Sequence, residues 1–519
     1  MSEFVNEPLL ELRRPEVRER LTDALAELDL ELPLEVPVLI DGEARARADF
    51  DSVDPARPER VVARAAAASA EEVREAVEAV GAARRAWEDR PASERAEVLL
   101  KAAVRLRSQR ERLAALTVRE AGKPWPDADA EVAEAIDFVE YYARGAVRLD
   151  EGRELIEPPG EHNRLRYAPR GVVAVIAPWN FPLAISTGMV VAGLATGNGV
   201  AYKPAEQTPG CALALVEALL AAGMPAGALA LLPGGDDPGI ALVASPGVHT
   251  IAFTGSCAAG LAISRAAAEP APGQGHMKRV IAEMGGKNCV IVDADADLDE
   301  VVPDVVRSAF AFAGQKCSAA ARLLVHERIA DGLASRLRGA IESLLVGPPD
   351  EFGTDVGPLI DGESVARYDR YLELARAEGS VEALGPSVPD RGYYRPPALV
   401  AGLPADSAVV NEEIFAPLLT FESIRSVEDG FARVEASQFA LTGGLFTRNP
   451  DVVAEAERRL PVGNLYVNRA ITGAVVGRQP FGGNRLSGTG SKAGGPDYLL
   501  GFVEPRVVSE NKTRHGLVV

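Results

Sequence analysis

Cys317 lies in the stretch FAGQKCSAAAR (residues 312–322), between Lys316 and Ser318. The thiolate is the reactive form of cysteine, and a neighbouring cation or a helix N-terminus stabilises it. Ser318 and the three alanines after it indicate the first turn of a helix, so the local sequence offers both features. The pattern fits a nucleophile, but it fits an inert, buried thiol equally well.

The remaining cysteines and the histidines give less indication of chemistry. Cys211 and Cys289 lie in apolar runs typical of a helix and a strand, and no acid or base accompanies Cys257. The four cysteines show no C-x-x-C spacing, which favours free thiols in a reducing cytoplasm and predicts no metal site. None of the five histidines lies in a context typical of Cys–His catalysis. A cysteine hydrolase remains an alternative.

Two segments could bind a nucleotide, although no G-x-G-x-x-G follows a predicted strand. The run HTIAFTGSCAAG (249–260) predicts a strand, a turn and a helix, with Gly255 and Ser256 at the helix N-terminus, where free N–H groups attract phosphate. An ordinary serine-capped helix would look the same. In YKPAEQTP (202–209), Lys203 and Glu206 follow a strand. A carboxylate there can bind ribose hydroxyls and repel a 2′-phosphate, favouring NAD over NADP, although a solvated ion pair is the alternative.

The composition excludes several classes of protein. The chain has 519 residues and a formal net charge of -20. The length predicts about two to four domains. Such an acidic chain is a poor nucleic-acid binder. The N-terminus lacks the pattern of a signal peptide, so we expect a cytoplasmic protein. The apolar run 171–204 could span a membrane, but its prolines and glycines favour a strand, a loop and a buried helix, and no membrane association is expected.

The predicted elements that must position these residues change in kind along the chain. Ser69 and Glu72 form a possible capping box, and further helices are predicted over 91–120 and 128–147. From residue 171, short β-branched runs alternate with helices at 183–196 and 208–222, and a second such block covers 289–470. This alternation predicts an α/β fold with parallel sheets, and a boundary near 281–288.

Seven short motifs give these residues a common context. They are PWNFP (178–182), KPAE (203–206), FTGS (253–256), EMGGKN (283–288), GQKC (314–317), EEIFAP (412–417) and PFGG (480–483). In this order, and spread over nearly the whole chain, they resemble the aldehyde dehydrogenase superfamily. The resemblance implies two Rossmann-type parallel-sheet domains plus a small β oligomerisation arm. The NAD-binding domain would comprise 1–150 and 170–282, the catalytic domain 283–470, and the arm 151–169 and 496–519.

The resemblance also implies roles for individual residues. Cys317 would attack an aldehyde, Asn180 and the Cys317 N–H would stabilise the oxyanion, and Glu283 would activate the hydrolytic water. The implied contacts of the NAD cofactor are Lys203 and Glu206 at the adenosine ribose, Gly255 and Ser256 at the pyrophosphate, and Trp179, Glu413 and Phe415 on the nicotinamide side.

The residues around the nucleophile are similar to those of 1-pyrroline-5-carboxylate dehydrogenases, which oxidise L-glutamate γ-semialdehyde to L-glutamate in the second step of proline breakdown. In this resemblance Lys316, Ser318, Gly473 and Ala474 would hold the substrate carboxylate, and Phe481 and Phe181 would line its carbon chain. Lys316 would also favour the thiolate. Ala320 and Ala321 depart from the pattern, since bulkier or thiol side chains are common there.

Two further expectations follow from the resemblance. The segment 153–171 looks like a hairpin arm that reaches a partner subunit, which implies a homo-oligomer, either a dimer or a hexamer of dimers. The substrate would be a small molecule. Another carboxylate-bearing semialdehyde dehydrogenase, or a non-catalytic scaffold with the same fold, remains an alternative.

Overall fold

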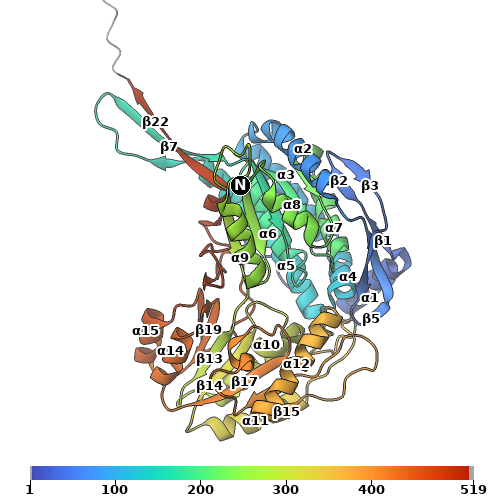
Figure 1. Cartoon of the computed structure of the whole chain (residues 1–519), viewed down its shortest axis with the longest axis vertical. Helices are drawn as coiled ribbons and strands as arrows, with labels where there is room; N and C mark the ends of the chain where they lie inside the picture. The colour runs from blue at the N-terminus through green and yellow to red at the C-terminus, as the bar shows by residue number, and fades with distance from the viewer. Residues whose placement is uncertain (1–2, 513–519) are drawn as a thin grey trace, which may run out of the picture.

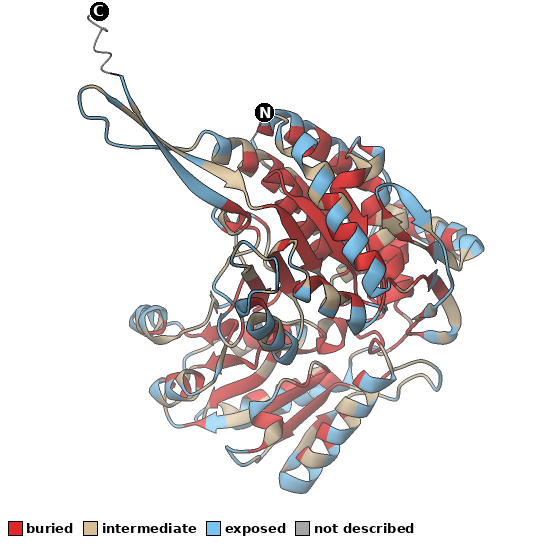
Figure 2. Cartoon of the chain, turned by 45° about the horizontal axis from the view of Figure 1, so that its top comes forward, coloured by how far each residue is buried: buried red, intermediate tan, exposed pale blue. Residues whose placement is uncertain are grey.

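The structure, a computed structural model, describes residues 3–512. It consists of two α/β units, one above the other in Figure 1, and a pair of long strands that projects from the upper unit. In each unit the buried residues gather on a central sheet and on the helix faces against it, as Figure 2 shows.

The first unit is built on a seven-stranded sheet of order β12-β11-β8-β9-β10-β2-β3. Its strands are β12 (Arg279–Glu283), β11 (Val248–Thr254), β8 (Val172–Ile176), β9 (Gly199–Lys203), β10 (Leu229–Leu231), β2 (Val38–Ile40) and β3 (Glu43–Arg45). The first five run parallel, and β2 and β3 add an antiparallel edge. Because side chains alternate along a strand, each face of the sheet buries its own set of helices.

One face of this sheet is covered by α2 (Ala70–Glu88), α8 (Asp236–Ala244) and α9 (Cys257–Ala268). The other packs on a larger helical layer, which contains α1 (Pro15–Glu31), α3 (Ala92–Ser108), α4 (Arg110–Ala121), α5 (Trp125–Asp150), α6 (Ala184–Ala195) and α7 (Pro209–Ala221). A small sheet of β1 (Leu34–Val36), β5 (Arg57–Ala65) and β4 (Phe50–Asp54) lies beside these helices. The run 171–204 thus forms β8, α6 and β9. No helix of the described chain is long and apolar enough to cross a membrane.

The second unit repeats the design. Its sheet has the order β15 (Ser380–Leu384), β16 (Ala398–Ala401), β17 (Leu418–Ile424), β14 (Ala320–His326), β13 (Asn288–Val292), β19 (Thr442–Phe446) and β20 (Asn464–Val467). All of its pairings are parallel except β15 with β16. Helices α10 (Leu298–Phe310), α11 (Ala330–Glu342) and α12 (Gly362–Glu378) cover one face, and α14 (Val427–Glu435) and α15 (Pro450–Arg459) cover the other. The predicted α/β fold with two parallel-sheet units is confirmed.

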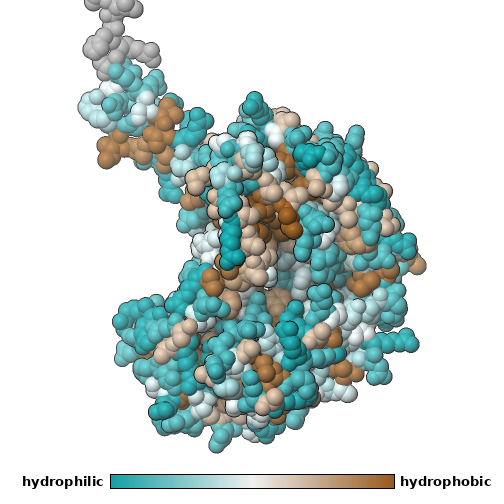
Figure 3. Space-filling model, in the orientation of Figure 1, coloured by the Kyte–Doolittle hydropathy of each residue, from teal (hydrophilic) through white to brown (hydrophobic). Residues whose placement is uncertain are grey.

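The projecting arm consists of β6 (Arg153–Glu154), β7 (Glu161–Pro169) and β22 (Val503–Asn511). β22 pairs antiparallel with β7 along its whole length. Apolar side chains lie on its surface, where Figure 3 shows brown patches, and Ile156, Val507 and Val508 are exposed. The last residues of the expected arm, 513–519, lie outside the described residues.

Shorter elements complete the chain. They are η1 (Ala226–Ala228), η2 (Ala311–Gly314), α13 (Ala408–Asn411), β18 (Phe439–Ala440), which pairs with β21 (Asn484–Arg485), and η3 (Tyr498–Phe502).

Two helix predictions need correction, and one motif is confirmed. Ser69 and Glu72 form the predicted capping box of α2. The helix predicted over 91–120 is two helices, because the backbone leaves helical geometry at Gln109 and turns the Arg110 side chain inward to Asp129. The helix predicted after Ser318 is wrong. Strand β14 begins at Ala320 and is buried between β13 and β17, so its place in the sheet overrides the helix propensity of its alanines.

Candidate active site

Cys317 lies in a short, strongly bent segment that leads from η2 into β14. Phe312 and Ala313 have φ of 52° and 53°, which is uncommon for residues other than glycine. The Gln315 side chain fixes the bend, because its oxygen accepts the Ile360 N–H at 2.8 Å. From the side of β13, the Asn288 amide donates to the Cys317 carbonyl at 2.7 Å. The thiol is therefore held by both neighbouring segments.

The electrostatics of the thiol differ from the expectation. Burial, together with the negative charges of Glu413 and Glu283, raises the pKa of Cys317 to about 12. Lys316 does not offset this effect, because its ammonium group binds the Asp127 carboxylate at 2.6 Å. The prediction that Lys316 and a helix N-terminus favour the thiolate is therefore wrong. The thiol must lose its proton when it reacts.

Glu283 ends β12 and is buried. One carboxyl oxygen accepts the Gly483 N–H at 2.8 Å, and the other has no hydrogen-bond partner. Burial raises the pKa of Glu283 well above 4.5, against the opposing effects of the Gly483 N–H and the Lys492 charge. Burial therefore favours the neutral carboxyl group, which must lose its proton to act as a base.

The peptide behind Glu283 comes from the far end of the chain. The Ser487 carbonyl accepts the Met284 N–H at 2.8 Å, and the Ala282 carbonyl accepts the Thr489 N–H at 2.9 Å. These residues lie along the end of β12 like one more strand. Gly482 and Gly488 are required there, since a Cβ on them would lie 2.8 and 3.0 Å from the Glu283 oxygens. These two glycines therefore let the peptide approach the carboxyl group of Glu283 closely.

Asn180 follows β8 in the first unit and reaches the thiol segment. Its buried side-chain amide donates to the Gln315 carbonyl at 3.0 Å. The amide nitrogen carries a second N–H, and an oxyanion site needs such a donor. Trp179, which precedes Asn180 in the chain, lies edge-on to the Phe415 ring, with 5.7 Å between the ring centroids. Phe181, which follows Asn180, has its ring centroid 3.5 Å from the Lys123 ammonium nitrogen.

Glu413 lies where the two units meet. It accepts the Gly286 N–H at 3.0 Å, and burial raises its pKa. A Cβ on Gly285 would lie 1.9 Å from a Glu413 oxygen, so the carboxylate occupies space that only glycine leaves. The neighbouring Phe415 has φ of 57°. Such strained backbone is common in binding sites.

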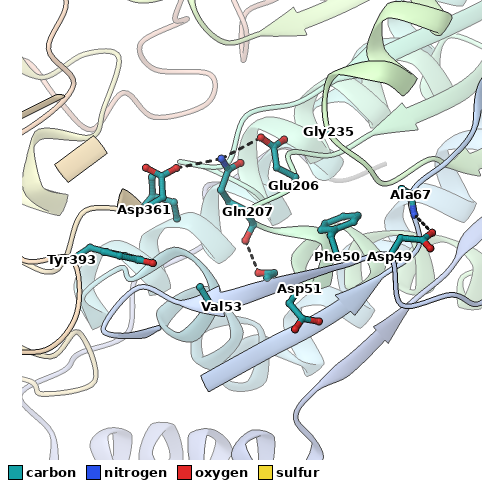
Figure 4. Close-up of a pocket in the computed structure, with 12 residues that line it drawn as sticks. Asp49, Phe50, Asp51, Val53, Ala67, Glu206, Gln207, Gly235, Asp361 and Tyr393 are labelled. Atoms are coloured by element: carbon teal, nitrogen blue, oxygen red, sulfur yellow. Dashed lines mark hydrogen bonds between the residues drawn. The ribbon is translucent and has the colours of Figure 1, made fainter. Parts of the chain in front are cut away.

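The other predicted nucleotide contacts lie on the first unit. Ser256 lies at the N-terminus of α9, as predicted, and Gly255 precedes it. The Ser256 hydroxyl accepts the Ala259 N–H, which is the serine cap of the alternative interpretation. Lys203 ends β9 and is buried, with its ammonium 3.5 Å from the exposed Glu206 carboxylate. Beside Glu206 lies a cavity of about 510 Å³, in which the Gln207 amide reaches both Glu206 and Asp361 (Figure 4).

Several charged residues near the thiol were missed by the sequence analysis. Asp127, Glu131 and Glu134 lie at i, i+4 and i+7 on α5, so they share one face of this helix. Glu131 binds the fully buried Lys123 at 2.5 Å. Burial and Glu131 raise the pKa of Glu134 to about 8, and Glu134 in turn acts on the Cys317 thiol. In the sequence DADAEVAE (127–134), the spacing of the acidic residues indicates that they share one face of a helix.

The predicted carboxylate-binding residues come from two segments: Lys316 and Ser318 flank Cys317 in the chain, and Gly473 and Ala474 lie in a later loop. Gly473 has φ of 77° and open space around it, and Ala474 follows in the same loop. Phe481 pairs its backbone with Ala493 through two hydrogen bonds. Ser318 is buried beside Cys317, and its carbonyl accepts the Thr442 hydroxyl at 3.2 Å. No cluster of possible metal ligands occurs among residues 3–512.

The comparisons place this geometry in a family, because the model of the aldehyde dehydrogenase family matches residues 42–508. The chain belongs to the aldehyde dehydrogenase family. Proteins named 1-pyrroline-5-carboxylate dehydrogenase 1 from Halalkalibacterium halodurans and 1-pyrroline-5-carboxylate dehydrogenase 2 from Bacillus subtilis are 40% and 41% identical to it. Each match covers 98% of this chain and 99% of the relative.

Solved structures of similar proteins agree with this family membership. A Thermus 1-pyrroline-5-carboxylate dehydrogenase with bound NAD has a TM-score of 0.96 at 40% identity, over 98% of this chain and 99% of that one. Proline utilization A from Bdellovibrio bacteriovorus has a TM-score of 0.97 at 41% identity, over 99% of this chain and 54% of that longer chain.

Proposed function

We propose that this protein oxidises L-glutamate γ-semialdehyde to L-glutamate with NAD. The observation that carries the proposal is the pairing of opposite charges around the thiol. The substrate has a carboxylate and an ammonium group, and each needs a partner when water is excluded. Lys316 has three N–H donors and uses one on Asp127, so two remain for the carboxylate. Glu134 offers a carboxyl group to the ammonium. The names of the two relatives agree with this substrate.

The carboxylate would also bind backbone N–H groups of Gly473 and Ala474. The left-handed Gly473 leaves its surroundings open, so a ligand can approach the backbone closely. Ser318 would contribute from the side of the thiol, and Phe481 and Phe181 would line the methylene groups. This assignment is compatible with a short aldehyde that carries both charges at one end.

The first step of the reaction is carried by Cys317. Its sulfur forms a bond to the aldehyde carbon as the π bond of the carbonyl opens, and the thiol proton passes to solvent, which leaves the carbonyl oxygen as the oxyanion of a thiohemiacetal. The charge that develops on this oxygen lies between the Asn180 amide and the Cys317 N–H. Donors held in place in this way can lower the activation free energy by about 3–4 kcal/mol.

NAD, when bound, supplies the acceptor for the hydride, after which a thioester remains on Cys317. Glu283 then takes a proton from the water that attacks this thioester, which regenerates the thiol and releases glutamate. Its unpartnered oxygen suits this role, since no hydrogen bond must break first.

The residues present fit NAD. The buried Lys203 and the Glu206 carboxylate would bind the adenosine ribose, and Ser256 at the start of α9 would bind the pyrophosphate. Glu413 would bind the nicotinamide ribose, in the space that Gly285 leaves free. Trp179 and Phe415 would pack beside it.

We also propose that the arm pairs subunits. Exposed Ile156, Val507 and Val508 give it the apolar surface of an interface. On this assignment residues 1–150 and 170–282 bind NAD, residues 283–470 carry the nucleophile, and 151–169 with 496–519 assemble a homo-oligomer.

The test is an NADH assay on a panel of glutamate, succinate and aliphatic aldehydes. We expect the highest kcat/KM for glutamate semialdehyde, and no NADH from a Cys317→Ala variant that still binds NAD. A preference for succinate semialdehyde would overturn the substrate, and normal turnover by Cys317→Ala would overturn the mechanism.

A further inference from the structure

The loop that holds Gly473 and Ala474, residues 471–477, bridges the two units; we call it the anchor loop. At its start, Ile471 packs in the core of the second unit and donates its N–H to the Ser308 hydroxyl at 3.0 Å. Near its end, Val476 packs in the core of the first unit. Between these points the exposed Gly473 has open space around it. The position of the loop therefore depends on how firmly both ends are held.

Residues 4–10 form an N-terminal segment without regular secondary structure that lies on the surface of α5. Two buried carboxylates of α5 hold its backbone. Asp137 accepts the Glu7 N–H at 2.7 Å, and Asp129 accepts the Leu10 N–H at 2.8 Å. Arg110 adds a hydrogen bond to the Pro8 carbonyl at 2.8 Å. The segment is thus fixed to the helix that also carries Asp127 and Glu134.

Asn6 connects this segment to the anchor loop. Its side-chain amide donates to the Asp137 carboxylate at 2.8 Å and to the Val476 carbonyl at 2.9 Å. Both N–H groups of one amide are therefore used, one toward α5 and one toward the loop. Phe4 supports the same contact, because its ring lies edge-on to Tyr141 of α5 at 5.1 Å and within 3.2 Å of the Cβ position of Gly477.

We propose that Asn6, with Phe4 beside it, is a positioning residue for substrate specificity, which fixes the anchor loop against α5. The inference rests on the proposed function. Gly473 and Ala474, which together with Lys316 and Ser318 would bind the substrate carboxylate, lie on the anchor loop. Glu134, which would bind the ammonium, lies on α5. The bridge through Asn6 sets the spacing between them. It touches neither the thiol nor the residues assigned to NAD, so it acts on substrate binding alone.

The test compares Asn6→Ala, Asn6→Asp and Phe4→Ala with the wild type. Asn6→Asp keeps the shape but removes the N–H donors, and Phe4→Ala removes the packing. Glu11→Gln is the matched control, since Glu11 is exposed nearby and pairs only on the surface with Arg13. Each variant is assayed with glutamate semialdehyde and with a short aliphatic aldehyde, and NAD affinity and thermal stability are measured.

We expect the Asn6 variants to raise the KM for glutamate semialdehyde about ten-fold, the effect of losing one or two partly buried hydrogen bonds. The kcat for glutamate semialdehyde, the KM for NAD and the turnover of the aliphatic aldehyde should each change less than about two-fold in the Asn6 variants. Glu11→Gln should match the wild type. Equal losses on both aldehydes, or no change in KM in a folded variant, would overturn the proposal.

A second measurement does not depend on the substrate. Hydrogen exchange of the amides in 471–477 should speed up in Asn6→Ala, while exchange in the two sheets stays as in the wild type. Unchanged exchange in the loop would also overturn the positioning role. If the wild type does not oxidise glutamate semialdehyde at all, the proposed function fails, and loop exchange still decides whether Asn6 holds the loop.

Discussion

Replacing Glu283 by glutamine separates the two halves of the proposed reaction. Glutamine has the same shape, and its oxygen can still accept the Gly483 N–H that Glu283 accepts at 2.8 Å. The oxygen without a partner becomes an NH2 group, so the change removes only the acceptor for the proton of water. Loss of a general base costs about 10²–10⁴-fold in rate, which is about 3–5 kcal/mol on the barrier. This cost falls on thioester hydrolysis and not on thiol attack.

The assay is rapid mixing of enzyme, NAD and glutamate semialdehyde, followed by NADH absorbance. Glu283→Gln should give a burst of about one NADH per active site and then a slow steady state, because acyl-enzyme accumulates. Glu412→Gln is the matched control, since Glu412 is exposed and lies next to the cofactor residue Glu413. A variant with no burst and a proportionally slow first turnover would refute the assignment of Glu283 to hydrolysis.

Stability gives an independent check on the same variant. Folding raises the pKa of Glu283 above 4.5, so above that pH the folded protein keeps a proton that the unfolded chain loses. This group therefore lowers stability as the pH rises above 4.5. Glutamine does not titrate, so we expect Glu283→Gln to melt at or above the wild-type temperature near pH 8. A large loss of thermal stability would mean that the carboxyl group is structurally required.

Three further outcomes are expected. Lys316→Ala should lower kcat/KM about 30-fold more for glutamate semialdehyde than for an aliphatic aldehyde, because only the semialdehyde loses a charge partner. Equal losses for both aldehydes would mean that Lys316 only pairs with Asp127 and does not bind the substrate carboxylate. Glu206→Ala should weaken the preference for NAD over NADP about ten-fold, and an unchanged ratio of kcat/KM values would exclude Glu206 from ribose recognition. The pKa of Cys317 is about 12, so the fraction of thiolate rises about ten-fold for each pH unit between about pH 7 and 9. The rate of Cys317 alkylation in the absence of NAD and substrate, measured by mass spectrometry, should rise by the same factor. A rate that is constant above about pH 7 would contradict this pKa.

The parts of the fold that depend on local pattern could be predicted from the sequence. The β-branched runs at 172–176, 199–203, 248–254 and 288–292 are strands because each lies in the middle of a parallel sheet and is buried on both faces. The alanines after Ser318 form a strand and not the predicted helix, since burial between two strands outweighs a helix propensity of a few tenths of a kcal/mol per residue. The break at Gln109 has no glycine or proline to mark it.

The candidate site could be predicted only as far as its residues lie in recognisable motifs. Cys317 and Glu283 were selected through their resemblance to a family, not through local chemistry. The charges on α5 were missed because their effect on the thiol depends on how a helix from the first unit packs against a loop of the second. The same holds for Lys316, whose neighbour in space is Asp127 rather than the thiol next to it in sequence.

The strand-like peptide behind Glu283 has a consequence for how the protein is made. Gly483 and Glu283 are 200 residues apart, and the whole second unit lies between them in the chain. On the ribosome, the first sheet can assemble up to β12 long before residues 482–489 have been synthesised. Until then the end of β12 is an open sheet edge, and the Glu283 carboxyl group lacks the Gly483 N–H that it accepts in the folded protein. Its hydrogen bond to Gly483 therefore forms only when synthesis is nearly complete.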